Sequence, residues 1–182
     1  MGGTVFITGA SSGIGKALAE EYARLGWNVG VLARRGEVLD ELVGALRGGY
    51  PSQRFAAAVA EVEVSGGTVA VKRVVIALDC GLVVNPNLVA AQLESSVVFG
   101  LGAALKQEIT WKKGRVEQSN YNDFDLLRLD ECPVIETHLV PGNAPPTGVG
   151  EPGLPPVAPA VANAVFAATG KRLRSLPLRP GR

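Results

Sequence analysis

A glycine-rich turn near the amino terminus constrains the fold more than any other feature of the sequence. A short apolar run, Thr4–Ile7, comes directly before it, and a helical pattern of apolar residues follows it and stops at Gly26. Gly9 permits a tight turn, Gly13 lets the backbone approach a pyrophosphate, and Gly15 lets helix and strand pack closely. The turn therefore predicts a strand, an anion-binding loop and a helix.

Strands and helices continue to alternate up to about residue 59. Asn28–Ala33 is expected to be a second buried strand, Gly36–Arg47 a second helix, and Arg54–Val59 the start of a third strand. Such alternation implies a parallel sheet with right-handed crossovers. We therefore expect an α/β fold in which residues 1–59 form a partial Rossmann βαβα unit. Its open sheet edge should be covered by the segment after Val59 or by a partner chain.

The turn resembles the amino-terminal cofactor motif of the short-chain dehydrogenase/reductase family, whose glycine spacing is Gly-x-x-x-Gly-x-Gly. The resemblance implies an NAD(P)-binding unit whose cofactor contacts come from Gly9, Ser11, Ser12, Gly13, Ile14 and Gly15. Arg34 and Arg35 stand where an NAD-specific member usually presents an acid to the ribose, which implies NADP(H). No tyrosine is followed four places later by a lysine, so the catalytic Tyr-x-x-x-Lys pair of that family is absent. The alternative is that these glycines only shape a turn that holds no cofactor.

From about Val59 an α+β pattern replaces the alternation. Residues 59–64 and 68–71 alternate with a period of two around Ser65-Gly66-Gly67, which predicts a β-hairpin. The remaining expected elements are a long apolar helix, in one or two pieces, at 88–105, a second hairpin with strands 109–111 and 116–118, a strand at 135–140 and a small-residue helix at 158–168.

A proline- and glycine-rich stretch, residues 141–159, holds 7 of the 12 prolines of the chain. Such composition is typical of a solvated linker. However, a single carboxylate, Glu151, stands between residues that restrict the backbone, in Gly148-Val149-Gly150-Glu151-Pro152-Gly153. This motif resembles the active-site loop of the xanthine dehydrogenase/aldehyde oxidase family of molybdenum hydroxylases. In that family the glutamate is the general base that activates the oxygen ligand of the metal.

The second resemblance covers roughly residues 55–182. It is carried by Asp79-Cys80-Gly81 with Val84-Asn85-Pro86, by Ala91-Gln92-Leu93-Glu94, by residues 99–105 and by residues 163–172. These motifs are most similar to the large (β) subunit of isoquinoline 1-oxidoreductase-type enzymes. The resemblance implies that residues 60–182 are a carboxy-terminal fragment of a molybdopterin-binding domain. Glu151 would be its base, and Gln92, Gly100, Gly102 and Gly150 would lie near the cofactor.

The resemblance also implies partners, because the molybdenum subunit of the family is several times longer and its 2Fe–2S subunit is a separate chain. We therefore expect an oxidoreductase-derived fusion fragment of molybdenum-hydroxylase type, which oxidises aldehydes or N-heterocycles such as isoquinoline only together with another protein chain. Two alternatives stay open at this point. One is an NADP(H)-binding module without catalysis, and the other is a non-enzymatic remnant or an artificial join.

Charge and cysteine content argue against several other classes. The 18 Lys and Arg residues nearly balance the 17 Asp and Glu residues, which is unlike a nucleic-acid-binding protein. Cys80 and Cys132, with one histidine, are too few for an iron–sulfur cluster or a structural zinc site, and we expect buried thiols. No uninterrupted run approaches the roughly 18 apolar residues of a membrane span. We expect a cytoplasmic protein with a small-molecule substrate or cofactor and with no nucleic-acid or membrane partner.

A nucleotide bound by the amino-terminal unit is expected to be NADPH rather than NADH. Arg34 and Arg35 can pair with a 2′-phosphate, whereas no acid is placed to bind the ribose hydroxyls. Calorimetric titration of the chain with both nucleotides tests this preference. Equal affinity, or tighter binding of NADH, would contradict it.

Overall fold

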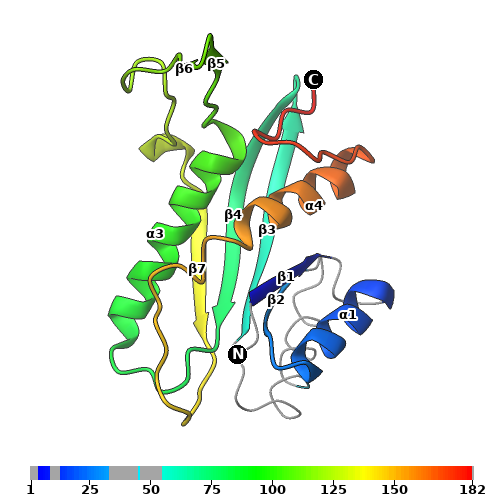
Figure 1. Ribbon diagram of the computed structural model, residues 1–182, viewed down its shortest axis with the longest axis vertical. Helices are drawn as coiled ribbons and strands as arrows, with labels where there is room; N and C mark the ends of the chain where they lie inside the picture. Colours follow the sequence, from blue (N-terminus) through cyan, green and yellow to red (C-terminus); the bar gives the residue numbers. More distant parts are fainter. Residues whose placement is uncertain (1–3, 9–12, 33–44, 46–54, 182) are drawn as a thin grey trace.

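The computed structural model describes residues 4–8, 13–32, 45 and 55–181, and most of its strands belong to one five-stranded sheet (Figure 1). The strands of this sheet lie in the order β1 (Thr4–Thr8), β2 (Asn28–Leu32), β3 (Phe55–Ser65), β4 (Thr68–Leu78) and β7 (Val134–Leu139). β3 and β4 are antiparallel, and the other neighbouring pairs are parallel. The predicted α/β class is confirmed at this level.

The amino-terminal elements follow the predicted order of strand, helix and strand. α1 (Gly13–Arg24) lies between β1 and β2 in the chain, and it begins within the glycine-rich turn. The chain leaves this helix through Gly26, whose φ of +80° is in the left-handed region that glycine adopts without strain. The helix predicted at 36–47 lies outside the described residues, so the partial Rossmann unit stays a prediction.

β3 connects the amino-terminal strands to the rest of the sheet. Its first residues, Phe55 to Ala58, pair with β2, and nearly its whole length pairs with β4. The hairpin predicted around Gly66 and Gly67 is therefore confirmed. The open edge of β2 was expected to be covered by the segment after Val59 or by a partner chain. It is covered by Phe55 to Ala58 instead, because the parallel pairing ends at Ala58. The division expected between residues 59 and 60 lies inside this strand.

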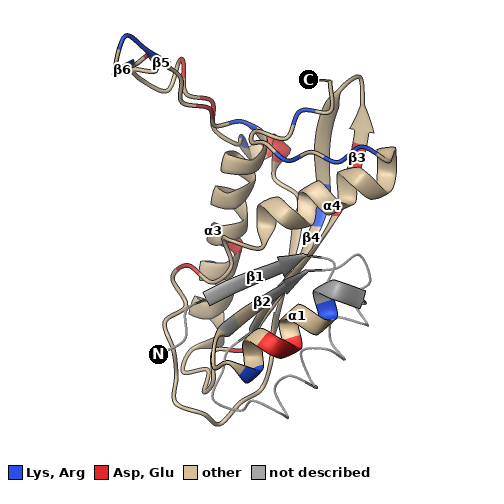
Figure 2. Cartoon of the chain, turned by 45° about the vertical axis from the view of Figure 1, so that its right-hand side comes forward, with Lys and Arg blue, Asp and Glu red and all other residues tan. Residues whose placement is uncertain are grey.

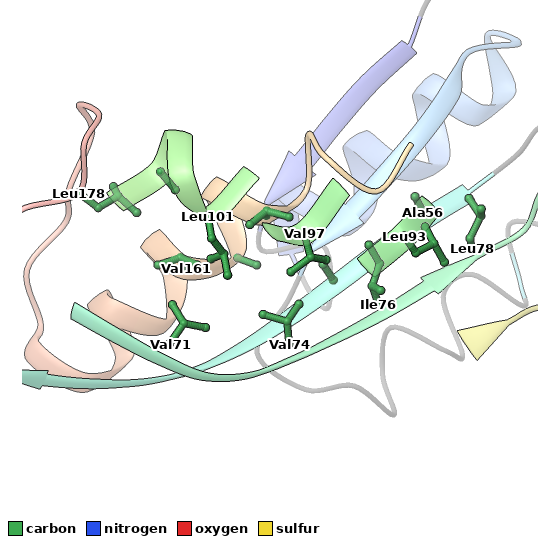
Figure 3. Packing of buried hydrophobic residues seen from close by; sticks show 14 of the residues in the cluster. Ala56, Val71, Val74, Ile76, Leu78, Leu93, Val97, Leu101, Val161 and Leu178 are labelled. Carbon is green, nitrogen blue, oxygen red and sulfur yellow. The ribbon is translucent and has the colours of Figure 1, made fainter. Parts of the chain in front are cut away.

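Two helices cover one face of the sheet and bury its apolar side chains (Figure 3). α3 (Pro86–Leu105) and α4 (Val157–Thr169) each carry apolar residues at intervals of four, which places them on one helical face. The fully buried side chains at the centre are Val74 and Ile76 of β4, Leu93, Val97 and Leu101 of α3, and Val157, Val161 and Val165 of α4. Burial of one such side chain contributes about 1.5–3 kcal/mol, so this cluster is the main stabilising contact of the described chain.

α3 is the long helix predicted at 88–105, in one piece. Asn85 caps its first turn by accepting a hydrogen bond from the Leu88 backbone N–H at 3.1 Å. With a mean hydropathy of 1.6 over an 18-residue window, α3 is long and apolar enough to cross a membrane. A count of uninterrupted apolar runs does not single out this helix, because Gln92 and Glu94 break the run. In this fold the inner face of the helix is apolar because it forms the core.

The shorter elements also agree with the sequence. β5 (Trp111–Lys112) and β6 (Arg115–Val116) form the second hairpin, and a short 3-10 helix, η1 (Leu129–Glu131), precedes β7. Both cysteines are free, and Cys80 is buried as expected. Cys132 is only partly buried, because it follows η1 at the surface, where its thiol donates to the Arg128 carbonyl at 3.4 Å.

Arg73 of β4 joins its two neighbouring strands, β3 and β7, on the other face of the sheet. Its Nε and Nη2 atoms donate to the Glu136 carboxylate of β7 at 2.8 and 2.7 Å, and its Nη1 donates to Glu61 of β3 at 2.9 Å. The hydrogen bonds from Arg73 hold the pKa of Glu136 below its usual value. This face of β4 therefore carries a charged side chain, whereas the opposite face carries buried apolar side chains.

Lys106, at the end of α3, binds two carboxylates that follow the second hairpin. Its Nζ lies 2.7 Å from Glu131 and 3.2 Å from Asp125. Partial burial alone would lower the pKa of Lys106, but these two carboxylates outweigh it and raise that pKa. Lys106, followed by the Arg128 backbone N–H, holds the pKa of Glu131 below its usual value. Because Lys106 precedes the hairpin and both carboxylates follow it, these ion pairs hold the two ends of the hairpin segment together.

Glu131→Gln is expected to lower the free energy of unfolding at neutral pH by up to about 1 kcal/mol, a small effect because water screens a carboxylate that is 38% exposed. Since the folded-state pKa of Glu131 is depressed, its contribution is present above the unfolded value near 4.5 and is lost as the pH falls through the folded value. Urea unfolding at several pH values should show the two curves converging in acid. Glu63→Gln, at a more exposed pair with Lys72, is the control and should change little. A difference that stays constant into strong acid would contradict the assignment.

Candidate functional site

The proline- and glycine-rich stretch is fixed to the body of the protein and is not a free linker. The Leu82 backbone N–H donates to the Ala144 carbonyl at 2.8 Å. Further along, both the backbone N–H and the hydroxyl of Thr147 donate to the Cys80 carbonyl, at 3.0 and 3.3 Å. These bonds tie the stretch to the loop that leaves β4, and they position the segment that carries the predicted base.

The Asp79-Cys80-Gly81 motif shapes the loop that leaves β4, at the place where the proline- and glycine-rich stretch packs against it. Asp79 is buried, and its Oδ1 accepts a hydrogen bond from the Gly81 backbone N–H at 2.9 Å. Gly81 has a φ of +76°, and a Cβ atom there would lie 2.5 Å from the Pro145 carbonyl oxygen and 2.7 Å from that of Ala144. Only glycine allows the two loops to approach this closely. The motif therefore has a structural role in this chain.

The loop that carries Glu151 rests on the middle of α3. The hydroxyl of buried Ser96 donates to the Gly150 carbonyl at 3.4 Å. Gly153 packs on the same serine, since a Cβ atom at this position would lie 2.9 Å from the Ser96 Cβ and 3.1 Å from Leu93. The backbone on both sides of Glu151 is thus held against the helix. Sequence reasoning did not assign Ser96, because a serine within an apolar helix carries no distinctive signal.

The Glu151 side chain is exposed, and Gln92 is exposed nearby on the helix surface. Residues 92 and 96 stand one turn apart on the same side of α3, so Gln92 lies along the row that Ser96 connects to the Glu151 loop. Two exposed apolar side chains, Leu88 and Phe99, continue this side of the helix. Gln92 and Glu151, two of the predicted site residues, are therefore both exposed, on the side of α3 where Ser96 holds Gly150. We call this surface the α3 outer face.

Gly100 and Gly102, also predicted to approach a cofactor, are covered by side chains of the chain itself. A Cβ atom on Gly100 would lie 2.9 Å from the Val157 Cβ, where α3 and α4 pack together. A Cβ atom on Gly102 would lie 3.1 Å from the Gln107 side-chain nitrogen. Both glycines are buried, and the structure does not bring them to the α3 outer face.

The predicted nucleotide site is described only in part. Gly13, Ile14 and Gly15 form the first turn of α1, as the motif predicts. The other members, Gly9, Ser11, Ser12, Arg34 and Arg35, lie outside the described residues. In the part of the chain that is described, no group of three or more His, Cys, Asp or Glu side chains is placed to hold a metal ion.

Sequence reasoning missed a cavity of about 730 Å³ near the carboxyl end of α3. Its lining combines the apolar side chains of Leu105, Leu127 and Leu178 with the charged groups of Lys106 and Arg179. These residues come from separate segments of the chain, and no local pattern in the sequence connects them. The cavity therefore becomes visible only in the folded chain.

Two family models match the chain, and they overlap. A molybdopterin cofactor-binding domain matches residues 43–133, and a short chain dehydrogenase matches residues 3–78. The β subunit of isoquinoline 1-oxidoreductase from Brevundimonas diminuta is 40% identical over 71% of this chain and 17% of its own length. A nicotinate dehydrogenase subunit from Pseudomonas putida is 39% identical over 68% of this chain and 11% of its own length. The chain thus spans less than a fifth of these relatives.

Solved structures show the same fold. Quinoline 2-oxidoreductase from Pseudomonas putida superposes with a TM-score of 0.60 at 22% identity, over 66% of this chain and 17% of that one. Aldehyde oxidoreductase from Desulfovibrio desulfuricans superposes with a TM-score of 0.55 at 28% identity, over 66% of this chain and 14% of that one.

Gly153→Ala is expected to lower the free energy of unfolding by about 1–3 kcal/mol, because the added methyl group overpacks the contact with Ser96 and Leu93. Gly148→Ala, five positions earlier in the same loop, meets nothing within 4 Å and is the matched control. Denaturant unfolding of both variants measures the difference. If the two variants were equally stable, the loop would not be held against α3.

Proposed function

We propose a function that proceeds from one fact: the chain belongs to the family of molybdopterin cofactor-binding domains. The relatives described above are oxidoreductases of molybdenum-hydroxylase type, which act on aldehydes or N-heterocycles. We propose that this chain provides the carboxy-terminal part of such an enzyme, with Glu151 as its general base. Residues 60–182 are its molybdopterin-binding part, and residues 1–59 carry the nucleotide-binding motif.

The placement of the Glu151 loop carries the proposal. A general base must be held where it can reach the reacting proton, and a rigid backbone holds it better than a free linker does. The Ser96–Gly150 hydrogen bond and the close packing of Gly153 restrict the backbone on both sides of Glu151. The carboxylate itself stays exposed, so a ligand or another chain placed over the α3 outer face can meet it.

The residues of the chain fit a molybdopterin cofactor as one wall of its site. The Gln92 amide can donate and accept hydrogen bonds with the polar edge of a pterin, and the Gly150 carbonyl is bound by Ser96, one helical turn further along α3. Nothing within 4 Å would meet a Cβ atom on Gly150, so this part of the loop is open to close approach. Gly100 and Gly102 do not contribute to this wall, because the side chains of Val157 and Gln107 pack against them. We propose that further polypeptide supplies the other walls.

Glu151 would act on a proton at its carboxylate oxygens. A bound molybdenum cofactor supplies the two-electron redox chemistry for hydroxylating an electron-poor carbon. The part played by Glu151 is to accept the proton that this step releases, and a positioned base of this kind typically contributes about 10²–10⁴-fold to the rate. Gln92 orients the ligand, and the apolar side chains of Leu88 and Phe99 exclude water once the face is covered.

We propose that further polypeptide covers the α3 outer face, since this chain spans 17% of the isoquinoline relative and 11% of the nicotinate relative. Both relatives are named as subunits, so we expect them to act within multi-chain assemblies. We propose that this further polypeptide supplies the upstream molybdenum-binding segments and that a partner chain supplies a 2Fe–2S centre. Alone, the chain should have no turnover.

A second function is favoured by the short chain dehydrogenase match over residues 3–78. In this alternative the amino-terminal unit binds NADP(H) without catalysis, through the glycine turn and the arginine pair. The nucleotide titration described above tests it independently of molybdenum. The two functions are compatible, since they use opposite ends of the chain.

Cofactor content and activity together test the main proposal. The chain is co-expressed with the upstream part of a related molybdenum subunit and its 2Fe–2S subunit, and molybdenum and pterin are measured in the purified material. Glu151→Gln is expected to lower the rate of aldehyde or N-heterocycle oxidation by about 10²-fold or more, with unchanged molybdenum and pterin content. Gln92→Ala should lower the pterin content itself.

Glu94→Gln is the matched control, because this exposed carboxylate of α3 faces away from the Gln92 row. It should leave both measurements unchanged. Turnover that survives in Glu151→Gln would refute the base. Oxidation of these substrates by the chain alone, supplied with molybdenum cofactor, would refute the need for a partner.

A further inference from the structure

We propose that the arm, defined as residues 107–124, is a docking element for a protein segment in which acidic residues flank a large apolar side chain. The arm follows the carboxyl end of α3 and stands away from the sheet and helices, with basic residues at its tip (Figure 2). It is separate from the Ser96–Gly150 contact, so this inference does not depend on Glu151 or on molybdenum chemistry.

Three cations crowd the tip of the arm. Lys112 of β5 and Arg115 of β6 lie directly opposite each other, and Lys113 occupies the turn between them with a φ of +51°. Like charges at opposed positions destabilise a strand pair, and lysine rarely adopts a left-handed conformation. In the described chain none of these three side chains forms an ion pair. The fold gains nothing from this charge, whereas an acidic partner would neutralise it.

Apolar groups adjoin the charged tip. Trp111 is 69% exposed and lies opposite Val116, which is also exposed. At the root of the hairpin a hollow of about 320 Å³ is lined by Ile109, Tyr121 and Phe124, together with polar groups. Exposed tryptophan and tyrosine are the side chains that most often dominate binding at protein interfaces. The hollow is suited to receive one large apolar side chain while the tip binds the acidic residues beside it.

The arm is ordered before any partner binds. The Thr110 backbone N–H donates to Gln118 Oε1 at 2.8 Å, and Gln118 Nε2 donates back to the Thr110 hydroxyl at 2.9 Å. That hydroxyl donates in turn to Glu117 at 2.8 Å. Below them, Asp123 accepts hydrogen bonds from the Ser119 and Asn120 backbone N–H groups. A preformed element loses less conformational entropy on binding, which favours a docking role.

The charge at the root decides which class of partner fits. Hydrogen bonds from the Asn120 and Ser119 backbone hold the pKa of Asp123 low, so its carboxylate stays ionised, and the arm also carries the Glu117 carboxylate, which accepts a hydrogen bond from Thr110. A nucleic acid following the arm would bring its phosphates against these carboxylates. Two copies of the chain joined arm to arm would bring six cations together. A short acidic protein segment puts its carboxylates at the tip and its apolar side chain in the hollow, so it need not extend along the arm past these carboxylates, and it brings no further cations to the tip.

The test uses the full chain and a capped pentapeptide, Asp-Glu-Phe-Glu-Asp, as the probe. Calorimetry at low salt should detect binding, and the fluorescence of Trp111 should shift in a Trp27→Phe background, where it is the one remaining tryptophan. The double variant K112Q/R115Q should weaken binding of the probe by about tenfold or more. The uncharged probe Asn-Gln-Phe-Gln-Asn should bind the parent chain as weakly as the acidic probe binds this variant. Replacing the phenylalanine of the probe by serine should also weaken it.

The control variant is K171Q/R174Q, which removes two exposed cations after α4 and should leave binding unchanged. K112Q/R115Q should unfold at the same or a higher temperature than the parent, because it relieves a like-charge pair, so loss of binding cannot reflect misfolding. Absence of probe binding, or equal losses in the two double variants, would overturn the proposal. Tighter binding of an octathymidylate strand or of phosphatidylserine vesicles, lost in K112Q/R115Q, would overturn it in favour of those ligands.

Discussion

The fold depends on the contact between the inner face of the β3–β4 ribbon and the two helices α3 and α4. Leu93, Val97 and Leu101 on one helix, and Val157 and Val161 on the other, meet at the same place and exclude water completely. The two segments with proposed functions, the Glu151 loop and the arm, adjoin the helices that form this contact. The Glu151 loop leads into α4, and the arm leaves the end of α3. A chain of this size has one core, so its position fixes the directions in which the loops leave it.

The elements with a regular apolar pattern could be predicted from the sequence, and the contacts between them could not. α3, α4 and the β3–β4 hairpin carry periodic apolar residues, which report burial directly. A strand starting at Arg54 and a hairpin strand at 59–64 were both predicted, but not that they form one continuous strand, β3, which pairs with β2 at its start and with β4 along its length. The cover of Gly100 by Val157 is equally invisible in the sequence, since a glycine in a helix looks the same whether a helix or a ligand approaches it. Glu151 could be singled out, but its support by Ser96 could not.

The two family resemblances meet in one strand. Both family models include residues 43–78, and β3 and β4 lie within that overlap. β3 can serve both neighbours because a strand offers one hydrogen-bonding edge to each side, parallel toward β2 and antiparallel toward β4. Its side chains near the junction are alanines, Ala56 to Ala58, which are buried. Small residues at a junction make few shape demands, so sheets of different origin can share such a strand.

The closed base of the arm has an evolutionary consequence. Lys106 binds Asp125 and Glu131 where the chain leaves and rejoins the body, so the two ends of the arm meet at one anchored point. Insertions or deletions between these ends change the closure entropy only slowly with length, and they leave the register of β4 with β7 untouched. The arm can therefore diverge freely among related chains while the core stays the same. A surface that varies in this way is well suited to distinguishing one partner from another.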